Sequence, residues 1–265
     1  MINKPVIGVA AAVVVVAAGT WYYLQSRHAA LPQAPGVAQT PASAQPPAEP
    51  AIQHPLPGGE DPASQAPLPP LADSDAAMRD ALSQVAGLAA VKDYLLPESI
   101  IRHLVVTIDN LPRQKVAVAK RPTSAVAGSF VADGDELHAT LDPRNFARYQ
   151  PMAAVVGRLD MQRLAAVYAH FYPLFQQAYQ DLGYPNGYFN DRLVQVIDML
   201  LATPQPTGPI ALVRPNVMYT FADPALESRP AGQKLLIRMG PDNAAAVKIK
   251  LEELRAAITA APPKR

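Results

Sequence analysis

The chain has 265 residues, of which 29 are proline and none is cysteine. The absence of cysteine excludes disulfide bonds, thiolate metal sites and cysteine nucleophiles. The 23 Lys and Arg residues nearly balance the 22 Asp and Glu residues, and the resulting net charge of +1 does not indicate a general polyanion partner.

An uncharged apolar run, PVIGVAAAVVVVAAGTWYYL, occupies residues 5–24. A helix of this length covers about 30 Å, the thickness of the hydrocarbon core of a bilayer. Lys4 precedes the run, and an aromatic cluster at residues 21–23 ends it just before Arg27, as is typical of a membrane interface. These features predict a transmembrane anchor at residues 1–28 that contacts the lipid bilayer through residues 5–24.

A cleaved signal peptide is the alternative, with Lys4 as its basic region and the small residues 16–18 as its cleavage site. The length of the apolar run and the aromatic cluster at its end favour an uncleaved anchor. The single charges of Lys4 and Arg27 nearly balance across the run. The free N-terminal amine adds to Lys4, so we expect a short N-terminus inside and the rest of the chain exported.

A proline-rich segment follows the anchor. Residues 31–70 hold twelve prolines, and Ala, Gln, Ser and Gly fill most of the gaps. This composition cannot bury enough apolar surface to offset the entropy of ordering, so it predicts a disordered linker at residues 29–70. Residues 31–70 could reach on the order of 120 Å in polyproline II conformation. A simple spacer is favoured over a PxxP docking site.

Helical periodicity dominates the remaining chain, residues 71–258, which is long enough for one hydrophobic core. Apolar residues recur at spacings of three and four from Met161 to Leu182, with Asp160 at the N-cap position and Gly183 after the end. Pro173 does not shift this phase, so we expect one kinked helix. Similar patterns predict helices from Ser74 to Ala89, from Pro97 to Ile108, from Asn190 to near Pro204, and from Val247 to Ile258.

Strand signals are short. Residues 130–132 and 137–141 flank Asp133-Gly134, and residues 210–213 and 217–221 flank a turn at residues 214–216, which is the pattern of two hairpins. A buried strand is the alternative to a helix for the β-branched segment after Pro97, but its 3/4 spacing favours helix. We therefore expect a mainly α (α+β) fold, an irregular helical domain with one or two short β-hairpins. Residues 259–265 are expected to form a disordered tail.

Motifs that carry known chemistry are missing. The sequence has no GxSxG elbow, HExxH motif, glycine-rich phosphate loop or nucleotide fingerprint. Its five histidines are scattered and form no pair at helical metal-ligand spacing. We therefore expect no metal and no cofactor, and the sequence favours a protein that is not an enzyme.

Three polar turns have an unusual composition. Residues 108–113 are a helix end with a polar run and a proline, and residues 183–192 and 213–221 combine aromatic residues with charged ones. Caps and turns explain them without a ligand, with Asn190 or Asp191 capping a helix. The functional interpretation is a pocket in which arginines meet an anionic or glycan group and tyrosines, including Tyr188, stack on it. The candidate binding residues are Asp109, Asn110, Arg113, Tyr184, Asn190, Asp191, Arg192 and Arg214. We predict that the 184–192 turn packs close to the 109–113 turn or to Arg214.

Long strings at these positions resemble a bacterial family known as a domain of unknown function. They are VVTIDNLPR, YPLFQQAYQDLGYP, YFNDRLVQVIDMLLATP, GPIALVRP, FADPALES and AGQKLLIRMGPDNAAAVKIKLEELR. The resemblance spans about residues 71–258 and implies an anchor, a proline-rich linker and a C-terminal domain. It implies an envelope protein of Gram-negative type. Together with the predicted anchor and its orientation, this leads us to expect a single-pass protein of the bacterial inner membrane with its C-terminal domain in the periplasm. It implies no activity, substrate or catalytic residue.

The segment LLIRMGPD at residues 235–242 resembles one helix-hairpin-helix unit, a motif that binds DNA phosphates through backbone amides. Asp242 stands in place of the second glycine of that motif, and its carboxylate would face the phosphates. A helix that stops at Gly240, followed by Asp242 or Asn243 as the next N-cap, explains the segment without a ligand. We therefore do not expect nucleic acid as a partner.

Anchor, linker and missing motifs together favour a binding or scaffolding module in the cell envelope, with an envelope protein or a cell-wall component as its partner. The alternative is a hydrolase or transferase acting on cell-wall glycan or peptide, which needs two carboxyl groups about 5 to 10 Å apart in a cleft. Carboxylates for such a site could come from Asp109, Asp191, Asp198 and Asp223. An anchored nucleic-acid-binding protein is the least favoured hypothesis.

Overall fold

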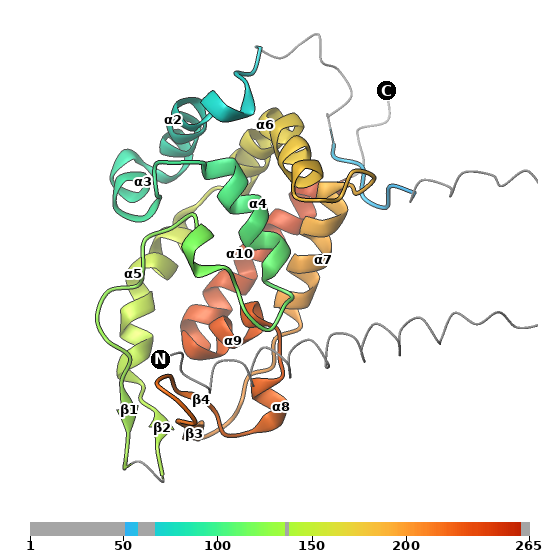
Figure 1. Ribbon diagram of the computed structural model, residues 1–265. Coiled ribbons are helices and arrows are strands. Elements are labelled where there is room, and N and C mark those ends of the chain that lie inside the picture. Colours follow the sequence, from blue (N-terminus) through green and yellow to red (C-terminus); the bar gives the residue numbers. More distant parts are fainter. Residues whose placement is uncertain (1–50, 58–66, 136–137, 261–265) are drawn as a thin grey trace, which may run out of the picture. The chain divides into compact units, whose positions relative to one another are not determined.

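Figure 1 shows the computed structural model, which describes residues 51–57, 67–135 and 138–260. These residues belong to one compact unit of the chain. The predicted anchor, much of the predicted linker and the last residues of the tail lie outside the described residues. Among the described helices, none combines the length and the apolar character needed to cross a membrane.

The described residues form nine helices and two short antiparallel strand pairs, which confirms the mainly α prediction. The helices are α2 (Asp75–Ala86), α3 (Leu88–Tyr94), α4 (Ile100–Asn110), α5 (Arg144–Arg158), α6 (Met161–Asp181), α7 (Phe189–Leu201), α8 (Pro224–Glu227), α9 (Ala231–Arg238) and α10 (Pro241–Thr259). The strands are β1 (Ala132–Asp133), β2 (Thr140–Leu141), β3 (Leu212–Val213) and β4 (Thr220–Phe221). Two 3-10 turns, Leu71–Asp73 and Val118–Lys120, complete the elements.

The longest helix, α6, begins and ends as its sequence predicts. The Asp160 carboxylate accepts hydrogen bonds from the backbone N–H groups of Gln162 and Arg163, which satisfies two donors of the first turn. The helix continues through Pro173, and Gly183 follows its end with a positive φ of 113°. This left-handed conformation favours glycine after a helix. The prediction of one helix across Pro173 is confirmed.

The main core forms where α6 packs against α10, α4 and α2, and where α7 packs against α10 and α4 (Figure 1). Aromatic rings from α6 and α7 occupy its centre: Phe175 and Phe189 stack with centroids 5.8 Å apart, and Phe189 has no exposed surface. The C-terminal helix closes the core through Ile258, which is 1% exposed. Burial of these side chains supplies the main driving force for folding.

The two hairpins are confirmed, with shorter strands than the sequence predicts. Ala132 pairs with Leu141 in the first, and Leu212 pairs with Phe221 in the second. Backbone hydrogen bonds join the hairpins, since Leu212 N–H donates to Ala139 O. Leu141, Leu212 and Phe221 form a second, smaller core with Ile237 of α9.

The structure corrects several local predictions. Gly87, with φ 86°, divides the predicted helix between Ser74 and Ala89 into α2 and α3. The Ser74 hydroxyl donates to Leu71 O and makes no capping bond. Helix α5 was not predicted, because Pro151 lies in its interior, a position at which proline usually ends a helix.

Two predicted helix caps are also wrong. Tyr188 is the N-cap of α7, and Asn190 and Asp191 lie inside its first turn. Gly240 is the N-cap of α10, so neither Asp242 nor Asn243 has that position. In both places the asparagine side chain forms a hydrogen bond with a distant segment instead of capping the helix. The Asn190 amide donates to His54 O, and the Asn243 amide donates to Phe146 O of α5.

Part of the predicted linker contacts the domain. We call residues 51–57 the docked segment; Leu56 within it is 7% exposed and belongs to the main core. Leu68 and Leu71 also pack against this core. The contacts of the domain therefore extend to residues before its predicted boundary at residue 71.

Candidate functional site

A buried carboxylate, Asp109, joins the end of α4 to the start of α7. It is 1% exposed and lies in the last turn of α4. The Arg192 guanidinium lies 3.0 Å from its Oδ1 and also donates to its backbone carbonyl at 2.9 Å. Arg113 Nη2 contacts Oδ2 at 2.8 Å. Both cations therefore lie at the C-terminal end of α4, where the helix dipole favours positive charge.

Tyr184 completes this cluster. Its hydroxyl donates to Asp109 Oδ2 at 3.3 Å and accepts from Arg113 Nη2 at 3.2 Å. The hydrogen bond that Arg113 itself donates to Asp109 is the main reason why the pKa of Arg113 is raised. Arg192 also donates to Gln195 Oε1 at 2.7 Å. Each of the three guanidinium nitrogens of Arg192 therefore has a hydrogen-bond partner within the domain.

The last turn of α6 and the loop between α6 and α7 form an aromatic wall beside this cluster. Tyr179 and Tyr184 stack with centroids 4.6 Å apart. Burial raises the pKa of the Tyr179 phenol, which therefore stays neutral. Gln176 fixes the loop by donating to Gly187 O at 2.7 Å and accepting from Phe189 N–H at 2.8 Å. A Cβ at Gly187 would meet the Tyr179 ring at 2.8 Å, so this close approach requires glycine.

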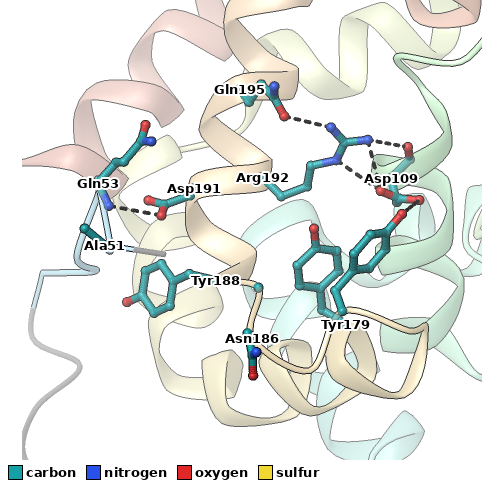
Figure 2. Close-up of a pocket in the computed structure, with 11 residues that line it drawn as sticks. Ala51, Gln53, Asp109, Tyr179, Asn186, Tyr188, Asp191, Arg192 and Gln195 are labelled. Carbon is teal, nitrogen blue, oxygen red and sulfur yellow. Dashed lines mark hydrogen bonds and ion pairs between the residues drawn. The ribbon is translucent and has the colours of Figure 1, made fainter. Parts of the chain in front are cut away.

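These elements line a pocket of about 390 Å³ (Figure 2). Its walls combine tyrosine rings, amides, two carboxylates and one guanidinium. The lining residues are Ala51, Gln53, Asp109, Tyr179, Tyr184, Asn186, Gly187, Tyr188, Asp191, Arg192 and Gln195. Such a mixture of aromatic faces and polar groups suits a ligand with hydroxyl or amide groups.

The structure brings two of the three polar turns together. Asp109, Tyr184, Asp191 and Arg192 line the pocket, and Arg113 contacts Asp109 and Tyr184. The predicted packing of the 184–192 turn against the 109–113 turn is therefore confirmed.

The remaining predicted residues lie elsewhere. Asn110 donates to Val106 O of its own helix. Asn190 is completely buried and turns toward the core, where the Tyr168 hydroxyl donates to it. Arg214 lies on the β3–β4 hairpin, with its guanidinium 5.5 Å from the centre of the Tyr219 ring. It does not line the pocket.

Sequence reasoning missed several lining residues. Gln195 lies one turn after Arg192 on the same face of α7, so helical spacing could have identified it. Tyr179 is part of the core-facing pattern of α6 and carried no separate signal. Ala51 and Gln53 come from the predicted linker, where no local pattern indicated a contact with the domain.

The carboxylates of the predicted hydrolase alternative all make other contacts. Asp109 is paired with two arginines, and Asp191 accepts two backbone N–H groups of the docked segment. Asp198 pairs with Arg255, and Asp223 caps α8. In the described part of the chain, no group of three or more acidic or histidine side chains could hold a metal ion. The geometry does not favour paired-carboxylate hydrolysis, which needs one carboxyl as acid and one as base or nucleophile.

The region with a resemblance to a helix-hairpin-helix unit is explained by packing. Gly240 has φ 86°, and a Cβ there would collide with the Phe146 ring. Two lysines of this basic region point to partners within the domain: Lys234 Nζ contacts Glu227 at 2.7 Å and Lys248 Nζ donates to Thr203 O at 2.6 Å. These contacts compete with phosphate binding.

Comparison with known protein families identifies one family that matches more than half of the chain. Residues 100–255 match the family described as protein of unknown function (DUF3014). The chain belongs to this family. The match includes α4, the aromatic loop and α7, and therefore every lining residue of the pocket from Asp109 to Gln195. No curated protein and no solved structure matches the chain.

Proposed function

We propose that the chain is a single-pass protein of the bacterial inner membrane whose exported helical domain is a non-catalytic binding module. The uncharged run at residues 5–24 supports the anchor, and the proline-rich composition that follows supports a tether. The partner is an envelope protein or a cell-wall component within reach of that tether.

The observation that carries this proposal is the pocket at the N-terminal end of α7. Arg192 and Asp109 hold its walls in place across 83 positions of sequence, and tyrosine rings and amides face the space between them. Asp109 is paired with two arginines and Asp191 accepts two backbone N–H groups, so both carboxylates serve contacts within the domain, which supports recognition rather than acid–base chemistry.

Topology is tested with reporters fused to the C-terminus of the full chain. We expect activity from a reporter that works only after export and none from a reporter that works only in the cytoplasm. The opposite pattern would overturn the periplasmic location.

Binding at the pocket is tested by cross-linking in cells. A photo-reactive residue replaces Asn186, which is exposed and lines the pocket, or Glu252, which is exposed on α10 and serves as the control. We expect a discrete adduct in the envelope fraction from position 186, weakened by Tyr184→Ala, and none from position 252. Equal adducts from both positions, or no adduct from position 186, would count against a binding module with this pocket.

A further inference from the structure

The docked segment is held mainly by its backbone. The Asp191 carboxylate accepts hydrogen bonds from two successive N–H groups, those of Gln53 at 3.0 Å and His54 at 2.6 Å. The Asn190 amide donates to His54 O at 2.8 Å, and Leu56 N–H donates to the Tyr188 hydroxyl at 3.2 Å. Two residues of α7, Asn190 and Asp191, and its N-cap Tyr188 thus contact the backbone over four positions.

One apolar side chain anchors the docked segment. Leu56 is buried in the main core, whereas Ala51, Ile52, Gln53 and Pro55 are exposed. Recognition therefore depends on backbone groups and one leucine, and it leaves most side-chain positions free to vary. A surface that reads a peptide in this way accepts other sequences with an apolar anchor at the same position.

The docked segment does not fill the space beside it. Ala51 and Gln53 line the 390 Å³ pocket on the Asp191 side, and Asp109 and Tyr179 lie across it (Figure 2). The small alanine side chain leaves this volume unfilled, and Tyr184 and Tyr188 on its wall are partly exposed, whereas Tyr179 is only 7% exposed. A larger aromatic side chain in the place of Ala51 would fill part of this volume, and we expect it to contact Tyr184 and Tyr188, because aromatic rings attract one another beyond the area they bury.

The surface and its occupant belong to different parts of the chain. Tyr188, Asn190 and Asp191 lie within the residues matched to the family, 100–255. The docked segment precedes that match and lies in the proline-rich region. The recognising residues are therefore part of the family domain, while the occupant comes from a region whose composition is that of a spacer.

We propose that this surface is a binding site for a non-helical segment of another polypeptide of the envelope, and that residues 51–57 occupy the site in cis. The partner segment carries a leucine in the place of Leu56 and a large aromatic side chain in the place of Ala51. The inference rests on the proposed function, because it names the ligand class of the same module. Since a short tether keeps the docked segment at an effective concentration of about millimolar, a partner must displace a strong competitor.

The experiment uses the full chain with Leu56→Glu, which removes the anchor in cis and leaves Tyr188, Asn190 and Asp191 unchanged. The probe is a fluorescein-labelled synthetic peptide of residues 49–58, measured by fluorescence anisotropy. We expect saturable binding to Leu56→Glu and at least tenfold weaker binding to the unsubstituted chain. A peptide with tryptophan in the place of Ala51 should bind at least threefold more tightly. A peptide N-methylated at Gln53 and His54, which lacks both donors, should not bind.

A matched pair of carboxylate substitutions locates the site. In the Leu56→Glu background, Asp191→Ala should weaken peptide binding at least tenfold, and Glu252→Ala should leave it unchanged. The inference is overturned if the peptide does not bind, if the N-methylated peptide binds equally well, or if both substitutions have the same effect. A tryptophan peptide that binds no better would overturn the assignment of the pocket to an aromatic side chain.

If Leu56→Glu does not fold, amide hydrogen exchange on the unsubstituted chain tests whether the docked segment can leave its site while the domain stays folded. We expect the Gln53, His54 and Leu56 amides to exchange through local opening, well before the core amides of α6 and α7. Exchange of these amides only upon global unfolding would make the docked segment an integral part of the fold and overturn the inference. A concentration-dependent dimer that Leu56→Glu abolishes would identify a second copy, rather than another polypeptide, as the occupant.

These results are separable from those for the proposed function. Loss of peptide binding with export and the position-186 adduct intact would remove this inference alone. Peptide binding by a chain that is not exported would remove the proposed location alone.

Discussion

Arg192 contacts Asp109 twice, through the carboxylate at 3.0 Å and through the backbone carbonyl at 2.9 Å. These two contacts connect the first turn of α7 to the last turn of α4. The Asp109 side chain is 2% exposed and that of Arg192 is 20% exposed, so little water screens the pair. The walls of the pocket depend on this connection.

Arg192→Ala should therefore destabilise the domain. Removal of one partner from a buried ion pair leaves an under-compensated charge, and we expect a loss of about 3 kcal/mol in the free energy of unfolding. Urea denaturation followed by circular dichroism measures it. Arg102→Ala is the matched control, because the Arg102–Asp181 pair is about half exposed and should contribute less than about 1 kcal/mol. Equal losses for the two variants would show that Arg192 is an ordinary surface residue.

Gly187→Ala should disturb the aromatic wall. The added methyl group would meet the Tyr179 ring at 2.8 Å and Tyr184 Cβ at 3.1 Å. Displacing these rings should cost about 1 to 3 kcal/mol, measured as a lowered melting temperature and altered near-UV circular dichroism. Gly157→Ala in α5, where the new Cβ would meet nothing within 4 Å beyond the neighbouring backbone of its own helix, should be neutral or stabilising. A Gly187→Ala protein with unchanged spectrum and melting temperature would contradict the close approach.

Phe189→Ala should create a cavity between α6 and α7. Its ring has no exposed surface and contacts Phe175 and Tyr179. Deletion of a buried phenyl ring costs about 3 to 5 kcal/mol, which chemical denaturation would detect. Leu88→Ala, at a position that is 72% exposed, is the control and should change stability by less than about 0.5 kcal/mol. A loss at Phe189 no larger than that at Leu88 would mean that the ring is not central to the core.

Glu227 gives the stability a defined dependence on pH. Burial opposes ionisation of its carboxyl, but hydrogen bonds from Lys234 and from Phe221 N–H outweigh it and lower the pKa below 4.5. A lowered pKa in the folded state stabilises the protein above the unfolded value and loses that effect as the pH falls through the folded value.

Glu227→Gln should therefore be less stable than the unsubstituted chain at pH 7, and the difference should shrink as the pH falls below 4.5. Denaturation curves of both proteins between pH 3 and pH 7 measure this. Glu252→Gln, which alters an exposed carboxylate on α10, is the control and should show no such trend. A stability difference between Glu227→Gln and the unsubstituted chain that stays constant down to pH 3 would contradict the lowered pKa.

Local patterns were reliable where the chemistry is local. The 3/4 spacing from Met161 to Leu182 reflects one apolar face of a helix. The Asp160 cap and the glycine at position 183 depend only on residues within the first and last turns of that helix. The same holds for α4, whose β-branched residues also suited a strand. The first hairpin was predicted correctly but its two-residue turn was not, because Asp133 lies in β1 and pairs with Thr140. Predictions were wrong where a polar residue had a partner far away, as at Asn190 and Asn243, whose side chains do not cap helices.

The sequence by itself thus determined the helical class of the domain and the presence of hairpins, because periodicity and turn chemistry act over a few residues. Its long matching strings also indicated the family. The tertiary structure alone decided that Arg192 pairs with Asp109 while Arg214 lies on a separate hairpin. Only the tertiary structure shows that Leu56, which lies in the predicted linker, is buried in the main core. These contacts join residues that are many positions apart, and the free energy that selects them comes from burial and pairing in the folded domain, which no local spacing records.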